Sequence, residues 1–106
     1  MIEINDIREI DVLWGPDLDE YNDNADISVT LNDGRRCWGQ IFTIANIIKL
    51  MNKYCVTGEH NPDYFWVRNL IITTHLTRDV VTNTIHDLIK QEHFEETFCF
   101  IENEHE

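Results

Sequence analysis

The sequence predicts a single α+β domain in the order β-β-β-α-β-α-β, whose two helices pack on a largely antiparallel sheet. Its length of 106 residues is typical of one domain. Apolar and polar residues alternate in the first half of the chain, which favours strands, and two later segments carry apolar residues at helical spacing. No Gly-rich or Pro-rich linker divides the chain. We therefore expect residues 1–106 to fold as one unit.

Three strands are expected first, over residues 7–14, 25–31 and 35–42. The second alternates most cleanly, with one apolar face and one polar face. Asn32-Asp33-Gly34 follows it and predicts a hairpin, because Gly, Asn and Asp tolerate the positive φ of tight turns. A two-residue loop would place Val29 opposite Trp38, and a three-residue loop would shift that register. The residues alone leave both loops open.

A helix is expected from Ile44 to about Cys55. Thr43 is a suitable N-cap, and Phe42 and Ile47 are spaced as a hydrophobic staple around it. Gly58 is expected to end the helix. Its apolar stripe consists of Ile44, Ile47, Ile48 and Met51.

The most apolar stretch, Tyr64 to Thr74, carries large side chains on both faces and predicts a central strand covered on both sides. Thr77 then caps a second helix that ends near Gln91, with Asp79 in its first turn, where a negative charge suits the helix dipole. A short last strand is expected over Phe98–Ile101. The stripe of the second helix consists of Val81, Ile85, Leu88 and Ile89.

Charge is the strongest functional signal in the sequence. Twenty acidic and eight basic residues give a net charge of −12. This excess argues against direct binding of nucleic acid or of an anionic membrane, because both require clustered Lys and Arg. Residues 1–34 hold ten acids and one base, and residues 91–106 hold six acids and no base. We expect an acidic loop at residues 15–26 and a frayed acidic tail at residues 102–106.

Nucleophilic and cofactor chemistry find little support. Ser28 is the only serine and lies outside any nucleophile elbow. The acidic loop does not match a calcium hand, because three required positions carry other residues. His60, beside Glu59 and Asp63, is the best local metal candidate, so a small metal-dependent enzyme is the alternative to a binding protein. We expect no cofactor and no catalytic residue.

The three cysteines are expected to be reduced thiols in the core, because they form no C-x-x-C pair. They are Cys37, Cys55 and Cys99. No apolar run is long enough to span a bilayer, and the acidic start lacks the features of a signal peptide. These observations predict a soluble cytoplasmic protein.

Aromatic side chains accompany the acidic segments. Trp14 and Tyr21 lie beside or within the acidic loop, and Tyr64 and Trp66 follow a second acidic segment. Tyr and Trp dominate binding energy at protein interfaces, and clustered charge accelerates association with an oppositely charged partner. The predicted contact surface for a basic protein consists of Asp17, Asp19, Glu20, Tyr21, Asp23 and Asp26, with Glu59 and Asp63 as a weaker second choice.

Residues 27–98 carry a series of short motifs. These are Asp33-Gly34-Arg35-Arg36, Phe42-Thr43, Asn46-Ile47 with Leu50-Met51, Thr57-Gly58-Glu59, Tyr64-Phe65-Trp66, and Leu76-Thr77 with Asp87-Leu88-Ile89. The arrangement resembles small bacterial immunity proteins of contact-dependent growth inhibition and related toxin systems. The resemblance implies a shared fold and an inhibitor that binds a toxin domain, and it assigns no binding residue.

This resemblance agrees with the charge. Nuclease toxins are basic because they bind nucleic acid, so a small acidic protein is a suitable inhibitor. Barnase and its inhibitor barstar show the same complementarity of charge. The sequence therefore predicts a cytoplasmic immunity protein or antitoxin that neutralises a basic toxin domain, with a homodimeric interaction protein as a further alternative.

Overall fold

The computed structural model describes residues 1–100 and confirms the α+β fold with the predicted order of strands and main helices. The predicted tail at 102–106 and the end of the last strand at Ile101 lie outside the described residues. Besides the short 3₁₀ turn η1 (Ile4–Asp6), the elements are β1 (Ile7–Leu13), β2 (Asn24–Leu31), β3 (Arg36–Thr43), α1 (Ile44–Thr57), β4 (Leu70–Thr73), α2 (Arg78–Lys90), α3 (Phe94–Thr97) and β5 (Cys99–Phe100).

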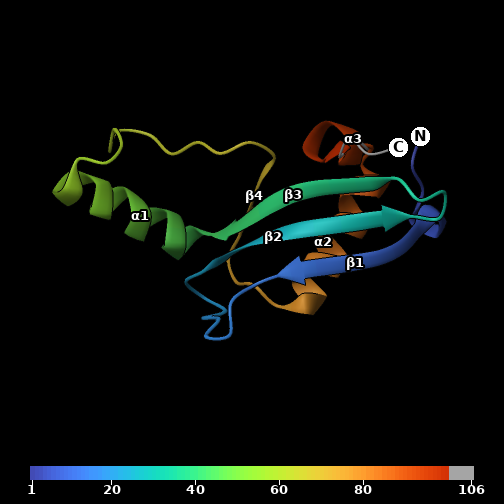
Figure 1. Cartoon of the computed structure of the whole chain (residues 1–106), viewed down its shortest axis with the longest axis horizontal. Helices are drawn as coiled ribbons and strands as arrows, with labels where there is room; N and C mark the ends of the chain where they lie inside the picture. The colour runs from blue at the N-terminus through green and yellow to red at the C-terminus, as the bar shows by residue number, and fades with distance from the viewer. Residues whose placement is uncertain (101–106) are drawn as a thin grey trace.

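The sheet has the order β1-β2-β3-β4, and β1, β2 and β3 are antiparallel neighbours. The outer edge of β3 is divided between two short strands. β4 pairs with its second half in parallel, and β5 pairs with its first half in antiparallel. Helix α2 lies against one face of the sheet, and no described helix covers the opposite face of β1, β2 and β3 (Figure 1). We call this opposite side the open face.

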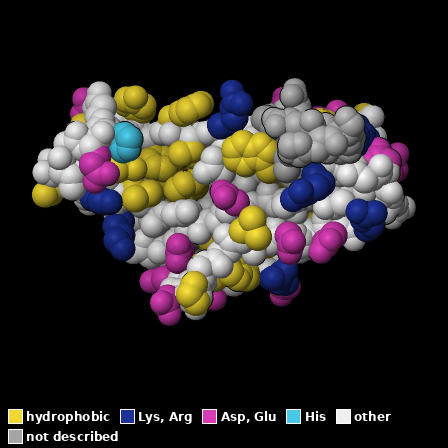
Figure 2. All heavy atoms as spheres, in the orientation of Figure 1, with side chains coloured by type: hydrophobic (Ala, Val, Ile, Leu, Met, Phe, Trp, Pro, Cys, Tyr) yellow, Lys and Arg dark blue, Asp and Glu magenta, His cyan; other side chains and the backbone are white. Residues whose placement is uncertain are grey.

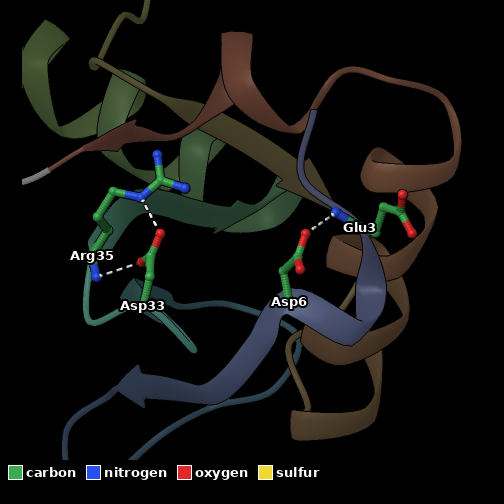
Figure 3. A network of polar contacts seen from close by, with 4 residues as sticks. All are labelled: Glu3, Asp6, Asp33 and Arg35. Carbon is green, nitrogen blue, oxygen red and sulfur yellow. Dashed lines mark hydrogen bonds and ion pairs between the residues drawn. The ribbon is translucent and has the colours of Figure 1, made fainter.

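The β2–β3 hairpin has a three-residue loop, Asn32 to Gly34, which places Val29 opposite Cys37. Gly34 has a φ of 92°, a conformation that glycine adopts without strain. The Asp33 carboxylate accepts hydrogen bonds from the backbone N–H of Arg35 (2.9 Å) and from its guanidinium Nε (2.7 Å), as Figure 3 shows. The register that the sequence left open is therefore the three-residue one.

The core lies between the sheet and α2. The inward residues of β2 are almost fully buried, as their alternation predicted, and they face the apolar stripe of α2. Thr77 caps α2 through a hydrogen bond from the backbone N–H of Val80 (3.2 Å), also as predicted. The central members of the core are Ala25, Ile27, Val29, Leu31, Ile41, Leu76, Val81, Ile85, Ile89 and Phe98.

Helix α1 begins and ends as predicted, capped by Thr43 and terminated at Gly58, which has a φ of 71°. The expectation that it packs on the sheet is wrong. It extends beyond the ends of the strands (Figure 1), which contributes to a longest dimension of 46 Å against 30 and 28 Å for the other two. Two residues of its predicted apolar stripe are accordingly exposed, Ile44 by 47% and Ile48 by 54%.

The prediction of a central strand from Tyr64 to Thr74 is also wrong. Only Leu70–Thr73 forms a strand, and it lies at the end of the sheet order beside β3. Asn69 has a φ of 59°, which interrupts the extended backbone directly before β4. The preceding residues run alongside α1, and Tyr64 and Trp66 are 62% and 70% exposed.

The cysteines divide by environment. Cys37 is fully buried on β3, and this burial raises the pKa of its thiol to about 11. Cys55 is exposed on α1, so the expectation of a core thiol is wrong there. The surroundings of the Cys99 side chain lie outside the description. Among residues 1–100, no helix has the length and apolar character needed to cross a membrane.

Candidate protein-binding surface

The predicted acidic loop connects β1 to β2, and two of its carboxylates determine its shape. Asp19 Oδ1 accepts a hydrogen bond from the backbone N–H of Tyr21 (3.1 Å). Asp23 accepts from the backbone N–H groups of Asp19 (3.1 Å, Oδ2) and Asn24 (2.8 Å, Oδ1). Short polar side chains stabilise turns in this way. Asp19 and Asp23 are therefore structural residues of the loop, whatever else they contact.

Several contacts fasten the loop to the rest of the domain, among them the following three. The Glu20 carbonyl accepts a hydrogen bond from the backbone N–H of Leu76 (2.6 Å). The exposed Tyr21 ring stacks on His75, with centroids 5.8 Å apart. The backbone N–H of Asp23 donates to Thr43 Oγ1 (3.2 Å) at the start of α1. The loop carboxylates are consequently presented on a fixed backbone.

Further carboxylates lie on the open face. The β1–β2 register places Glu9 opposite Thr30 and Asp11 opposite Ser28, on the same side as Asp26. All three acids are exposed. Together with the exposed loop acids they form what we call the acidic face, defined as Glu9, Asp11, Asp17, Asp19, Glu20 and Asp26.

The site prediction from the sequence missed Glu9 and Asp11, although their alternation with Ile10 and Val12 was visible in the sequence. Arg36 is the one basic residue of β1, β2 and β3 that the register places on the open face. Arg36 lies on β3, and its guanidinium is 3.5 Å from Ser28 Oγ of β2.

An apolar groove adjoins this face. It lies between α1 and the segment that follows, and its volume is about 500 Å³. We call it the α1 groove. Figure 2 shows apolar side chains gathered over this end of the molecule, on the same side as the open face. Its lining residues are Asn24, Phe42, Leu50, Tyr54, His60, Asn61, Tyr64, Phe65, Trp66 and Val67.

Two aromatic contacts lie in the lining of the groove. Phe65 packs edge-on against Phe42 of β3, with ring centroids 5.1 Å apart, and His60 packs edge-on against Tyr54 of α1 at 4.7 Å. Asn24 forms the boundary with the acidic face, because it shares the open face of β2 with Asp26 and also lines the groove. The groove therefore borders the strand that carries Asp26.

The second group of predicted contact residues lies elsewhere. Glu59 and Asp63 are exposed in the segment after α1, away from the β1–β2 loop (Figure 1). Glu59 forms an ion pair with Lys53, at 3.6 Å between Nζ and Oε1, which neutralises part of its charge. The fold does not bring these two acids together with the acidic loop.

The local metal candidate has no supporting geometry. The ring of His60 packs edge-on against Tyr54, and the Glu59 carboxylate pairs with Lys53. Across residues 1–100, no three His, Cys, Asp or Glu side chains form a group that could hold a metal ion.

Comparison of the chain with protein-family models, with curated proteins and with solved structures found no match.

Proposed function

We propose that this chain is a binding protein that carries out no reaction of its own, and that it is an immunity protein or antitoxin of the bacterial cytoplasm. Its partner is a basic protein, of which a toxin nuclease domain is the best example. The observation that carries the proposal is the acidic face. It displays six exposed carboxylates over the β1–β2 loop and the uncovered side of the sheet.

The acidic face affects how fast the partner binds, and the α1 groove affects how long it stays bound. A surface of one charge sign raises the association rate for an opposite partner by roughly 10- to 1000-fold at low salt. Charge alone leaves a complex sensitive to salt, and hot-spot energy comes mainly from aromatic residues in water-excluding pockets. The α1 groove, which Tyr64 and Trp66 help to line, offers a bound partner an apolar recess from which it could exclude water. We therefore expect the partner to insert an apolar side chain there.

The first experiment sequences the genes on either side of the one that encodes this chain, and measures association kinetics with the basic toxin domain that the proposal expects there. The variant Glu20→Lys with Asp26→Lys is preferable to one at Asp19, because neither side chain forms a hydrogen bond or ion pair among the described residues. We expect association to slow roughly tenfold at low salt and this difference to shrink as salt screens the charges. The matched control, Asp87→Lys with Glu92→Lys, makes the same charge change outside the acidic face.

The proposal fails if both double variants slow association equally, or if no toxin domain is encoded nearby. Inhibition of the nuclease must also follow the measured affinity.

A second experiment separates the groove from the charge. Trp66→Ala is expected to accelerate dissociation by roughly 30-fold, the effect of losing about 2 kcal/mol of binding energy, while association stays near that of the wild type. Val56→Ala is the control, because Val56 is 87% exposed and lies outside the groove. Equal dissociation rates for the two variants would show that the groove lies outside the interface.

A further inference from the structure

Helix α1 carries an apolar surface that belongs neither to the acidic face nor to the α1 groove. Ile44, Ile48, Met51 and Cys55 are spaced by four, three and four residues. This spacing is the a/d repeat with which two helices pack against each other. Ile44, Ile48 and Cys55 are all exposed, and Met51 is partly exposed. We call these four residues the α1 seam.

The seam faces away from the domain. The opposite side of α1 carries Asn46, which is 7% exposed and accepts a hydrogen bond from Asn24 Nδ2 (2.8 Å). Leu50 and Tyr54 lie on an adjacent side and line the groove. At 3.6 residues per turn, the seam positions fall on a different side from all three of these residues. No described residue therefore buries the seam fully.

The charges near the seam indicate what could cover it. The only charged residues of α1 are Lys49 and Lys53, which fall outside the a/d positions, and the positions flanking the seam are uncharged. Residues 44–69 hold three bases and two acids, a net charge of +1. The other described residues, 1–43 and 70–100, hold five bases and fifteen acids, a net charge of −10. Two copies can therefore approach each other here without opposing their acidic surfaces.

We propose that the α1 seam binds the α1 seam of a second copy of this chain, with the two helices antiparallel across a two-fold axis. The antiparallel arrangement follows from charge. The acidic part of each copy adjoins the N-terminal end of its α1, so parallel helices would place the two acidic parts side by side. In the antiparallel pair, Ile48 faces Met51 of the other copy, and Ile44 faces Cys55.

Charge also favours a second copy over a basic partner at the seam, and favours the seam over the β1 edge as the site of pairing. A basic partner would gain no electrostatic attraction at the seam, whose helix carries only Lys. Pairing of two copies through the free edge of β1 would bring Glu9 and Asp11 close to their own counterparts, an arrangement that charged edge strands prevent. The α1 pairing leaves the acidic face of each copy on the outside, and it stands independently of the proposed toxin partner.

The seam is short, so we expect the dimer to be weak. A helix of 14 residues is about 21 Å long, and four seam residues bury less than the roughly 800 Å² per partner of a standard interface. We therefore expect a reversible monomer–dimer equilibrium and not a permanent dimer.

Sedimentation velocity of the full chain, from about 5 µM to about 500 µM, tests this equilibrium. The wild type is expected to pass from monomer to dimer over this range, and Ile48→Glu to stay monomeric, because the carboxylate would be buried without a partner. Val56→Glu is the matched control, since it makes the same chemical change on the same helix at an exposed position outside the seam. Circular dichroism checks that both variants keep the fold. A wild type that stays monomeric throughout, or equal dimerisation of the two variants, overturns the proposal.

Oxidative crosslinking tests the orientation. The variant Ile44→Cys is expected to form a disulfide-linked dimer through the new thiol and the native Cys55 of the other copy. Adding Cys55→Ala to this variant should abolish that product. The wild type should not crosslink through Cys55, because antiparallel helices hold the two Cys55 residues apart. Efficient wild-type crosslinking through Cys55 would overturn the antiparallel arrangement.

Discussion

Two neighbouring threonines should respond in opposite directions to the same substitution. Thr43 and Thr73 are register partners on β3 and β4. The Thr43 hydroxyl accepts hydrogen bonds from the backbone N–H groups of Asn46 (3.1 Å) and Asp23 (3.2 Å). Thr73 Oγ1 is buried and has no hydrogen-bond partner among the described residues. Replacement by Val keeps the shape of each side chain and removes only the hydroxyl.

The magnitudes follow from these contacts. Thr43→Val removes the N-cap of α1, which costs about 0.5–2 kcal/mol of unfolding free energy. It also leaves the N–H of Asp23 without its acceptor, which adds about 1–3 kcal/mol. We expect a total loss of free energy of unfolding of roughly 1.5–5 kcal/mol. Thr73→Val should instead stabilise the fold by about 1 kcal/mol, because an unsatisfied buried hydroxyl is replaced by a methyl group.

Urea unfolding followed by circular dichroism measures both changes, with an unchanged m-value as the check on two-state behaviour. Thr77→Val is the control, because Thr77 caps α2 through a single hydrogen bond, from the N–H of Val80, and should lose only about 1 kcal/mol. Hydrogen exchange should accelerate at the amides of Asp23 and Asn46 in Thr43→Val alone. Equal losses for Thr43→Val and Thr77→Val, or a destabilised Thr73→Val, would refute this account.

Two further predictions concern β3. Gly39→Ala should cost about 1–3 kcal/mol in urea unfolding, because the new Cβ would lie 3.0 Å from the buried ring of Phe98, and Phe98→Leu should recover part of the loss; a neutral Gly39→Ala would contradict this. The raised pKa of Cys37, about 11 against 9.0, predicts that stability falls as pH rises from about 9 to about 11, because the unfolded thiol loses its proton first. Cys37→Ala should flatten that part of the pH profile, and a slope identical to that of the wild type would exclude Cys37 as its cause.

Short-range sequence signals correctly predicted the ends of the helices and the buried face of β2. Thr43 and Thr77 identified both helix starts, and Gly58 identified the end of α1, because caps depend on bonds within a few residues. The alternation of β2 identified its buried face. Hairpin register was undecidable from the same residues, since Asn32-Asp33-Gly34 suits loops of two lengths.

The sequence predictions were wrong where burial of an apolar segment depends on whether another element packs against it. The stripe of α1 and the run from Tyr64 to Val67 are apolar enough to suggest burial, and sequence periodicity does not reveal whether another element covers them. Asn69, in a left-handed conformation, separates that run from β4, and the aromatic side chains of the run line the groove together with residues of α1. The α1 groove follows from this interruption, so its residues could not be assigned from composition.

The acidic loop shows why charge density alone does not identify contact residues. Asp19 and Asp23 use their oxygen atoms to accept from backbone N–H groups, whereas Glu20 and Asp26 present theirs to solvent. Substitution of the first pair would alter the loop and its contact with Thr43, and any loss of binding would mix two causes. Substitution of the second pair changes the charge on an intact backbone. If the partner recognises the electrostatic field, substitution of Glu20 and Asp26 should slow association in proportion to the charge change, and salt should reduce this effect. If the partner recognises the shape of the loop, substitution of Asp23 should lower the affinity at every ionic strength.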